Sequence, residues 1–310
     1  MIVIGLMSGT SMDGVDAVAC RIEGKGRHPR VTPLAAVHLP YPAKLRRRIG
    51  AVAGADGRAD ELCRLNVEIG ALFGKAARQA MALLPADRPA TLVASHGQTV
   101  RHLPAEGATL QIGDPAVIAQ VTGLPVWSQF RSADMARGGQ GAPLAPVAHR
   151  LLFGGAENTL VVNLGGMANV SWIPAGADDL AAVVGYDIGP GMRLVDMATQ
   201  KAIGRPFDRD GWLARKGNVV ASHLLSLLAH PYYRKRPPKS TGRELFNERY
   251  LADAGIDLAR ADADLVATLT ELTASVVGKE GKRVVQIITF GAMKGHYPLP
   301  VSGRSTAIRR

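Results

Sequence analysis

Three apolar runs lie within the first 41 residues of the chain, at positions 2–7, 15–24 and 31–41. The first two are separated by a turn of small and polar residues, 8–14. Apolar runs of this length between turn-forming residues predict β-strands, and short connections predict antiparallel neighbours. The chain is therefore expected to begin as an antiparallel meander.

A long helix is expected over residues 58–84, because its apolar positions recur with helical spacing. The face that they form comprises Leu62, Leu65, Ile69, Leu72 and Phe73. Residues 91–94 then predict a buried strand that ends in a polar turn. A short helix within 111–123 and a further strand within 124–130 are expected to follow.

A second hairpin is expected at 159–173, where two apolar strands flank the turn Asn163-Leu164-Gly165-Gly166. Residues 183–204 predict a strand, a glycine-rich turn and a helix, and 211–272 are mainly helical around a proline-rich loop. Strands and helices mix with two hairpins. The pattern indicates an α/β protein that is neither a repeat array nor a simple βα alternation.

The turn from Ser8 to Gly14 combines two glycines, three hydroxyls and one carboxylate. Glycine lets backbone N–H groups approach a phosphate, hydroxyls donate further hydrogen bonds, and a carboxylate holds the magnesium that accompanies a nucleotide. An ordinary tight hairpin is the alternative, since Asp-Gly is common in such turns. The turn Asn163 to Asn169 is similar, as in a duplicated fold that clamps a nucleotide from two sides. The chain contains neither the Walker A pattern nor G-x-G-x-x-G, which argues against a P-loop.

Asp187 stands at the end of an apolar strand, just before the turn Gly189-Pro190-Gly191 that leads into a helix. A carboxylate in this place suits a general base or a metal ligand. The alternative is a helix cap or a turn aspartate.

Two clusters of hydrogen-bonding residues, 95–99 and 111–114, contain almost no apolar side chains and suit a polyhydroxylated ligand such as a sugar. His96 has no second histidine at metal-ligand spacing. Arg131 lies three residues before Asp134, so the two can pair on one helical turn, or Arg131 can hold a carboxylate in bidentate fashion.

With 310 residues, 47% of them hydrophobic and 20% charged, the chain is long enough for two globular domains. No apolar run approaches the roughly 20 residues that span a bilayer, and we find no signal peptide. The two cysteines, Cys20 and Cys63, are far apart, which favours a reduced cytoplasmic setting.

The net charge of +11 raises the question of nucleic-acid binding, but its distribution argues against it. Residues 275–310 hold seven basic residues against one acidic residue. A second basic stretch, 232–243, contains Pro237-Pro238 and Gly242, so it is a loop and not a groove-reading helix. That loop is either solvated or in contact with an anionic ligand.

Eight motifs in order resemble those of the anhydro-N-acetylmuramic acid kinases, a family of the sugar kinase, heat-shock protein 70 and actin superfamily. They are GLMSGTSMDGVDAV, SHGQT, QIGD, QFRSADMARGGQGAPL, VNLGGMANVS, YDIGPGMRLVD, FDRDG and HPYYRKRPPKSTGRELF. The resemblance covers residues 1 to about 272. It implies a two-domain, ribonuclease H-like α/β fold of the actin and sugar-kinase type, with an ATP and sugar cleft between domains 1–125 and 126–274.

The resemblance implies a cell-wall recycling enzyme that uses ATP and Mg²⁺ to open 1,6-anhydro-N-acetylmuramic acid and to phosphorylate O6. Asp187 matches the catalytic aspartate, which would deprotonate the water that attacks the anomeric carbon. Gly165 and Gly166 match the second phosphate turn, and Asp13 would lie near magnesium. The first phosphate loop would comprise Gly9, Thr10, Ser11, Met12, Asp13, Gly14, Val15 and Asp16.

The sugar side would comprise His96, Gln98, Asp114, Arg131 and Asp134. We hypothesise that Arg131 or the loop 239–243 meets the lactyl carboxylate. The expected partner is the small-molecule sugar, with neither nucleic acid nor membrane, and the family suggests a homodimer.

The chain also departs from the family pattern. Tyr186 and Met192-Arg193 stand where the family usually has Phe and Asn-Ala. After about Ala274 the family has a helix, a strand and a triple-glycine turn that holds adenosine. Residues 275–310 match none of these, so we expect an aberrant basic tail produced by a frameshift or a premature stop. The alternative function is therefore a catalytically impaired, sugar-binding remnant of such a kinase.

Overall fold

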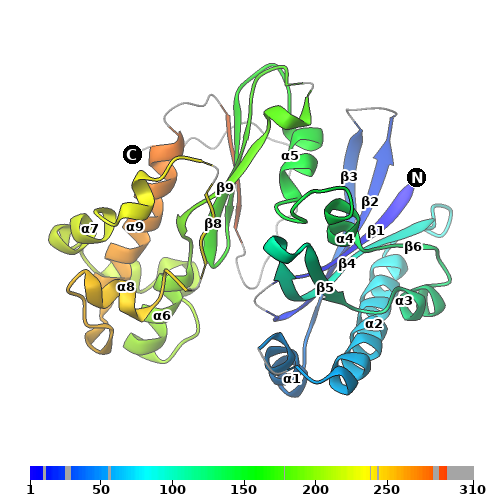
Figure 1. Ribbon diagram of the computed structural model, residues 1–310, viewed down its shortest axis with the longest axis horizontal. Coiled ribbons are helices and arrows are strands. Elements are labelled where there is room, and N and C mark those ends of the chain that lie inside the picture. Colours follow the sequence, from blue (N-terminus) through cyan, green and yellow to red (C-terminus); the bar gives the residue numbers. More distant parts are fainter. Residues whose placement is uncertain are drawn as a thin grey trace. The chain divides into compact units, whose positions relative to one another are not determined.

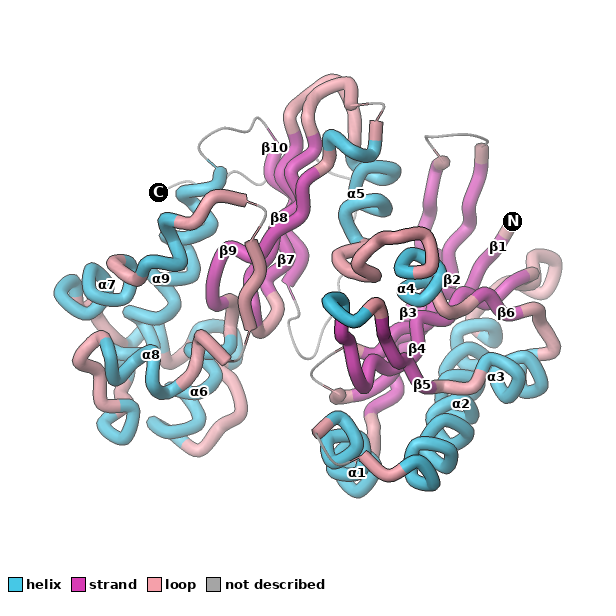
Figure 2. The backbone as a smooth tube through the Cα atoms, viewed as in Figure 1, coloured by secondary structure: helices cyan, strands magenta, loops and turns pink. Residues whose placement is uncertain are grey.

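The computed structural model describes residues 1–9, 12–24, 29–54, 57–177, 179–237, 239–242, 244–281 and 286–291 of the chain. The chain divides into two compact units, Met1–Leu144 (unit 1) and Ala145–Arg310 (unit 2). Each unit has its own sheet and helices (Figures 1 and 2). Each also has its own hydrophobic core. The expected α/β fold is confirmed.

Unit 1 is built on a sheet with the strand order β3-β2-β1-β4-β5, and β6 also pairs with β4. The strands are β1 (Ile2–Ser8), β2 (Gly14–Glu23), β3 (Arg30–Pro40), β4 (Leu92–Leu103), β5 (Ala108–Ile112) and β6 (Val126–Trp127). The pairs β1–β2 and β2–β3 are antiparallel, whereas β1 is parallel to β4. The predicted meander at the start of the chain is thus confirmed.

Among its described residues, unit 1 has four α-helices, of which α1, α2 and α3 bury apolar residues in its core. They are α1 (Ala43–Ala53), α2 (Ala59–Ala82), α3 (Pro115–Thr122) and α4 (Phe130–Met135). Leu65, Ile69 and Phe73 of α2 are fully buried in the core of unit 1, which confirms the helix and the face predicted from its spacing. The sequence pattern had not predicted α1.

The polar turn expected after residue 94 is absent, because β4 continues through Ser95-His96-Gly97-Gln98-Thr99. Both edges of this segment are paired: Gln98 lies opposite Ser8 of β1 and Ile112 of β5. Gly97 has a φ of 73°, a left-handed conformation that glycine adopts without a steric penalty. The pairing of this segment with β1 and β5 therefore makes it a strand, although its polar composition favours a turn.

Residues 126–144 fold with unit 1, although the sequence analysis placed them in the second domain. Val126 of β6 pairs with Val93 of β4, which ties this segment to the first sheet. The division accordingly falls after Leu144 and not after residue 125.

Unit 2 contains a four-stranded sheet in the order β10-β7-β8-β9. Its strands are β7 (Thr159–Leu164), β8 (Met167–Ile173), β9 (Val184–Pro190) and β10 (Gln286–Gly291). The pairs β7–β8 and β8–β9 are antiparallel, which confirms the second predicted hairpin. β10 runs parallel to β7, so a strand from far along the chain completes the sheet.

The helices of unit 2 surround a core that includes Phe246, Leu251 and Leu272, each of which is fully buried. They are α5 (Ala145–Phe153), α6 (Arg193–Ile203), α7 (Ala221–Leu228), α8 (Glu248–Asp253) and α9 (Ala263–Gly281). α9 lies against both α6 and α7 (Figure 1). Among the described residues, no helix has the length and apolar character needed to cross a membrane.

Candidate functional site

The start of the first turn is held by the side chain of Gln98, which is 0% exposed. Ser8 Oγ donates a 2.7 Å hydrogen bond to Gln98 Oε1. Gln98 Nε2 donates to the carbonyl oxygens of Gly9 (3.3 Å) and Thr99 (3.2 Å). Because both ends of the amide are bonded inside the protein, Gln98 positions the turn, and the sugar contact expected of it does not fit this geometry.

Replacing Gln98 by leucine is expected to lower the free energy of unfolding by about 2 kcal/mol, because Ser8 and the Gly9 carbonyl lose buried partners. Urea denaturation followed by circular dichroism measures this loss. Gln200→Leu is the control, at an exposed position of α6, and should change the free energy by less than about 0.5 kcal/mol. Equal stability of the two variants would contradict the positioning role of Gln98.

The rest of the first turn is compact. Thr10 and Ser11 lie outside the described residues. Met12 has a φ of 54° and donates its N–H to the Gly9 carbonyl at 3.1 Å. The carbonyl oxygen of Asp13 accepts the N–H of Tyr41 at 2.9 Å, so the position of Asp13 is fixed by the chain that follows β3.

The last three residues of the expected first phosphate loop have structural partners in the sheet. Val15 is 0% exposed and belongs to the core. Asp16 Oδ1 lies 2.8 Å from His38 Nδ1 on the neighbouring strand. A Cβ on Gly14 would lie 2.5 Å from the Leu39 carbonyl oxygen, so glycine is needed there for β2 and β3 to approach. These residues support the turn from the sheet.

Arg131 connects His96 to the loop at Gly141. Arg131 Nε donates to His96 Nε2 at 2.9 Å, and Nη1 donates to the Gly141 carbonyl at 3.1 Å. His96 Nδ1 therefore carries the ring hydrogen and donates to the Gly97 carbonyl at 3.0 Å. The Gly141 N–H donates to Asp134 Oδ2 at 2.8 Å. Among the ion pairs of the described residues, none joins Arg131 to Asp134; both bind Gly141 instead.

The pKa of His96 is lowered, chiefly by burial of the ring and further by the positive charge of Arg131, while the Gly97 carbonyl opposes the shift. The folded state thus favours the neutral ring. The stability that it contributes is complete above the unfolded pKa of about 6.5 and is lost as the pH falls through the lower folded pKa.

We therefore expect the free energy of unfolding to fall more steeply from about pH 7.5 to about pH 5.5 in the wild type than in His96→Gln. Urea denaturation at several pH values measures both slopes. The comparison isolates His96 from the other histidines whose pKa burial lowers, His102 and His149. Parallel profiles for the two proteins would show that the His96–Arg131 contact does not favour the neutral ring.

Asp114 is the N-cap of α3. Its Oδ1 accepts the N–H groups of Ala116 (2.8 Å) and Val117 (3.4 Å). Asn66 Nδ2 donates to Oδ2 at 3.3 Å. Both carboxylate oxygens are thus engaged in fixing the start of α3, which does not fit the direct sugar contact expected of Asp114.

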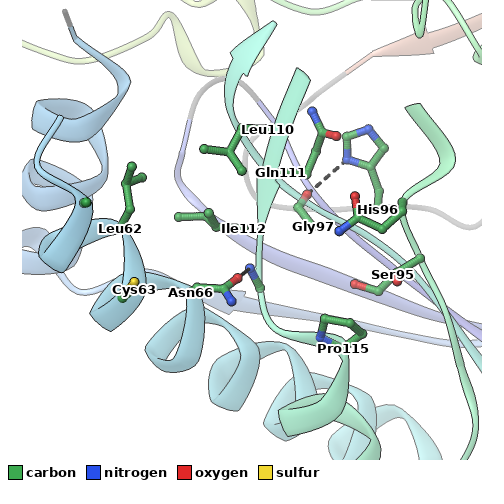
Figure 3. A pocket seen from close by; sticks show the side chains of 14 residues that line it. Leu62, Cys63, Asn66, Ser95, His96, Gly97, Leu110, Gln111, Ile112 and Pro115 are labelled. Carbon is green, nitrogen blue, oxygen red and sulfur yellow. Dashed lines mark hydrogen bonds between the residues drawn. The ribbon is translucent and has the colours of Figure 1, made fainter. Parts of the chain in front are cut away.

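A cavity of about 420 Å³ opens in unit 1 beside α2, β4 and β5 (Figure 3). Its lining includes Asn66, Ser95, His96, Leu110, Gln111 and Ile112. In Figure 3 the side chains of Leu110 and Ile112 point toward α2, whereas Gln111 points toward His96. The cavity thus combines an apolar wall with hydrogen-bonding groups, as is common in small-molecule sites.

In unit 2, Asp187 lies on β9 opposite Asn169 of β8. The N–H of Thr241 donates to Asp187 Oδ2 at 2.9 Å. The Asp187 N–H donates to the Lys239 carbonyl at 3.0 Å, and its carbonyl accepts the Tyr232 hydroxyl at 2.7 Å. One segment, 232–241, therefore holds both the backbone and the carboxylate of Asp187.

The pKa of Asp187 is raised, chiefly by burial and also by the negative charge of Glu244, while the Thr241 N–H lowers it. α6 begins at Arg193 with Met192 at its N-cap, so Asp187 is not a helix cap. A half-buried carboxylate with a raised pKa is suited to accept a proton near neutral pH.

In the basic stretch 232–243, Tyr232 and Tyr233 are buried, whereas Arg234, Lys235 and Arg236 are exposed, as expected of a solvated loop. Tyr232 is 2% exposed, and the Lys239 Nζ lies 4.8 Å from the centre of its ring. Burial is the main cause that lowers the pKa of Lys239. Arg243, part of the loop hypothesised to meet a carboxylate, lies outside the described residues.

The turn between β7 and β8 rests on the turn before α6. The Gly165 carbonyl accepts the Met192 N–H at 2.8 Å. The Gly166 carbonyl accepts the N–H groups of Gly191 (3.0 Å) and Arg193 (3.2 Å). Within the described residues the N–H groups of Gly165 and Gly166 have no hydrogen-bond partner, and a Cβ on Gly166 would meet no atom within 4 Å. Backbone N–H groups at a glycine turn can hold a phosphate group.

A ready-made metal site is absent from the part of the chain that the structure describes. No group of three or more His, Cys, Asp or Glu side chains is placed there to hold a metal ion. Asp13 thus belongs to no such group among the described residues.

The family model for anhydro-N-acetylmuramic acid kinase matches residues 1–287. The chain belongs to this family. The anhydro-N-acetylmuramic acid kinase of Variovorax paradoxus (strain S110) is 44% identical over 310 residues, which cover 94% of this chain and 81% of the relative. That of Bordetella pertussis (strain Tohama I) is 43% identical over 288 residues, covering 88% of this chain and 72% of the relative. The ROK hexokinase of Thermus thermophilus is 13% identical with a TM-score of 0.36 over 93% of each chain, too slight a likeness to support a conclusion.

The match to the anhydro-N-acetylmuramic acid kinase family extends past residue 274, where the second domain was expected to end. α9 continues to Gly281, and β10 pairs with β7, so residues 275–281 and 286–291 belong to unit 2. The helix and strand that the resemblance implied are thus present, and the expectation of an aberrant tail does not hold for these residues. Residues 292–310, where the triple-glycine turn was sought, lie outside the described part.

Four residues of this family member were not predicted individually, although Ser95 and Gln111 lie in the clusters 95–99 and 111–114 and Thr241 lies in the loop 239–243. Thr241 and Tyr232 bond to Asp187, and Ser95 and Gln111 line the cavity of unit 1. All four lie in motifs that carried the resemblance. A motif indicates a segment, but only the fold shows which of its side chains and N–H groups point to the site.

Proposed function

We propose that this protein is an ATP-dependent kinase that hydrolytically opens 1,6-anhydro-N-acetylmuramic acid and phosphorylates O6, giving N-acetylmuramic acid 6-phosphate and ADP. The observation that carries the proposal is Asp187, in a chain of this family. Its carboxylate is half-buried in the middle of β9, is oriented by the Thr241 N–H at 2.9 Å, and has a raised pKa.

Asp187 acts as the general base of the proposed reaction. It takes a proton from a water molecule, whose oxygen forms a bond to the anomeric carbon. The bond between that carbon and O6 breaks, and its electron pair stays on O6. O6 then forms a bond to the γ-phosphorus as the bond to the departing ADP breaks, so one water is consumed for each phosphoryl group transferred.

When bound, ATP supplies the phosphoryl group, and magnesium supplies charge neutralisation. The N–H groups of Gly165 and Gly166 would hold phosphate oxygens, since they have no other partner among the described residues. Asp13 would supply one carboxylate oxygen to the magnesium. The first turn that carries Asp13 is closed by the hydrogen bond from the Met12 N–H to the Gly9 carbonyl. The same carbonyl also accepts a hydrogen bond from Gln98 Nε2.

The sugar would occupy the cavity of unit 1, where His96 offers a ring held in one tautomer by Arg131. Arg131 Nε and Nη1 are already engaged, so Arg131 would meet the lactyl carboxylate through Nη2. Asp134 and Asp114 would not contact the sugar. Asp134 holds the Gly141 loop, and Asp114 holds the start of α3.

A coupled assay of ADP release, with purified protein, ATP, Mg²⁺ and the anhydro sugar, tests the proposal. Mass spectrometry of the product should show the mass of the sugar increased by one water and one phosphoryl group. If calorimetry shows sugar binding but the assay shows no ADP release, the proposed kinase function is overturned and the alternative of a sugar-binding remnant is supported. If the protein neither binds the sugar nor releases ADP, both the kinase function and the sugar-binding alternative are overturned.

A further inference from the structure

We propose that a pocket at the C-terminal end of α6 binds a phosphate monoester, with arginine side chains on the phosphate and aromatic side chains on the organic part. The pocket has a volume of about 350 Å³, and all of its lining residues belong to unit 2. α6 begins beside the glycine turn at Gly165 and extends for 11 residues, about 16 Å, to the pocket at its other end. The proposal therefore goes beyond the proposed function and does not depend on it.

The segment that forms the pocket, 203–215, is folded back on itself by one carboxylate. Asp208 Oδ1 accepts the Leu213 N–H at 2.8 Å, and Oδ2 accepts the Ala214 N–H at 2.9 Å. Leu213 is buried in the core of unit 2, and the short 3₁₀ helix Ala214–Lys216 packs against α9. The fold therefore holds the pocket in place before any ligand arrives.

Positive charge gathers at this pocket. Arg205, Arg209 and Arg215 line it, and none of the three forms an ion pair or a side-chain hydrogen bond with a described residue. Lys216 adds a fourth charge beside them, because its Nζ lies 3.5 Å from the centre of the Trp212 ring. The N–H donors of the three guanidinium groups are thus available to a ligand.

The balance of charge favours a phosphate over a carboxylate. The acidic side chains of the lining are Asp208, whose two oxygens are already bonded, and Asp210. Four cationic side chains against two carboxylates leave a net charge of +2. A phosphate monoester carries about −1.5 to −2 at pH 7, whereas a carboxylate carries a single charge. The planar donor fork of arginine also matches the oxygens of a phosphate.

The dipole of α6 explains only part of this arrangement. The negative end of a helix stabilises a cation within its last turn, which accounts for Arg205, directly after the terminal Gly204. Arg209 and Arg215 lie on later turns, 209–211 and 214–216. Arginines held around one pocket repel one another, and a bound anion would offset that repulsion.

The rest of the lining is apolar and consists of Ile203, Phe207 and Trp212, of which Trp212 is 47% exposed. Arg205 Cζ lies 5.9 Å from the centre of the Trp212 ring, and Arg209 Cζ lies 5.9 Å from that of the Phe207 ring. A phosphate held by these guanidinium groups would therefore bring its organic part against the aromatic side chains. Sugar rings and nucleotide bases both present flat faces to such side chains, so a phosphosugar and a mononucleotide share the required chemistry.

Calorimetric titration of the full chain with N-acetylglucosamine 6-phosphate and with AMP tests the proposal. At least one of the two esters should bind, and Arg205→Gln and Arg215→Gln should each weaken that binding about 10-fold. Arg249→Gln is the matched control, because it removes the same charge from an exposed position of α8, and it should bind like the wild type. Thermal melting checks that each variant remains folded.

Further ligands separate the phosphate from the ring. N-acetylglucosamine and adenosine lack the phosphate, so any binding that they show should be unchanged in Arg215→Gln. Inorganic phosphate lacks the ring and should bind more weakly than the ester; equal binding would overturn the role of the aromatic side chains. The ester whose binding falls in Arg215→Gln identifies the source of the ligand, sugar or nucleotide.

Tryptophan fluorescence gives a readout at the pocket itself. Binding of the ester should change the emission of the wild type, because Trp212 lines the pocket. Trp212→Phe keeps an aromatic ring, so it should still bind the ester in the calorimeter but lose the change in emission. A change in emission that persists in Trp212→Phe would place the ligand elsewhere.

Two results would overturn the pocket as a phosphate monoester site. In the first, neither ester binds the wild type. In the second, an ester binds, but Arg205→Gln and Arg215→Gln bind it as tightly as the wild type does, so that it occupies another site. Because these measurements involve no turnover, neither result bears on ADP release, and the proposed function is tested separately.

Discussion

Asp187→Asn is expected to lower kcat about 1,000-fold, since a general base contributes 10²–10⁴-fold and an amide cannot accept the proton. The backbone bonds from Asp187 to Lys239 and Tyr232 do not involve the carboxylate, and an amide oxygen can still accept the Thr241 N–H. The variant should therefore fold and bind the sugar like the wild type. ADP release under saturating substrates measures kcat, and calorimetry measures sugar binding.

Asp253→Asn is the matched control, because its carboxylate is 70% exposed on α8. It should retain the wild-type kcat. A kcat for Asp187→Asn within tenfold of the wild type would contradict the role of Asp187 as the base.

The pH profile gives a second readout of the same group. A base must be deprotonated, so kcat/KM is lost as the pH falls through the pKa of Asp187. Burial and Glu244 raise that pKa above its ordinary value of 3.8, so the loss should begin at a higher pH than for an exposed aspartate. Glu244→Gln removes the repulsive charge and should move the acid limb to lower pH. An unchanged limb would contradict the influence of Glu244.

Gly191→Ala is expected to lower the free energy of unfolding by about 3 kcal/mol, the upper end of the cost of overpacking. Its Cβ would lie 2.2 Å from the Gly165 carbonyl oxygen and 3.0 Å from the Met167 carbonyl carbon. Both are backbone atoms and cannot rotate away, so the two turns must separate. The hydrogen bonds from Gly191 and Met192 to the glycine turn would be lost with them.

Urea denaturation measures this change, and Gly155→Ala is the matched control because a Cβ there would meet no atom within 4 Å. The control should change the free energy of unfolding by less than about 0.5 kcal/mol. If Gly191→Ala proves as stable as the control, the contact between the two turns is not tight.

Local signals in the sequence were sufficient for several elements. Turn residues between apolar runs predicted both hairpins, and helical spacing predicted α2 with its buried Leu65, Ile69 and Phe73. These elements form from interactions between residues close in sequence, which a pattern records directly. A strand that carries Asp187 was predicted for the same reason, but β9 continues through Pro190, so Asp187 lies in the middle of the strand and not at its end.

Other features depend on pairing between distant segments, which composition does not record. The polar run from Ser95 to Thr99 was expected to be a turn, yet β1 and β5 pair with it on both sides. The Thr241 N–H reaches Asp187 across 54 positions, and Gln98 reaches Gly9 across 89. Residue type alone did not show that the side-chain amide of Gln98 supports the first turn from inside the protein.

The pairing of β10 with β7 sets the order in which unit 2 can be completed during synthesis. β7 ends at Leu164, but its outer neighbour begins only at Gln286, more than a hundred residues later. At 5–20 residues per second, the ribosome takes roughly ten seconds to reach it. Throughout that time one side of β7 exposes unpaired N–H and C=O groups, which are a template for association with other chains. Until β10 has been synthesised, the free edge of β7 in the nascent chain must therefore be shielded by the rest of unit 2 or by a chaperone.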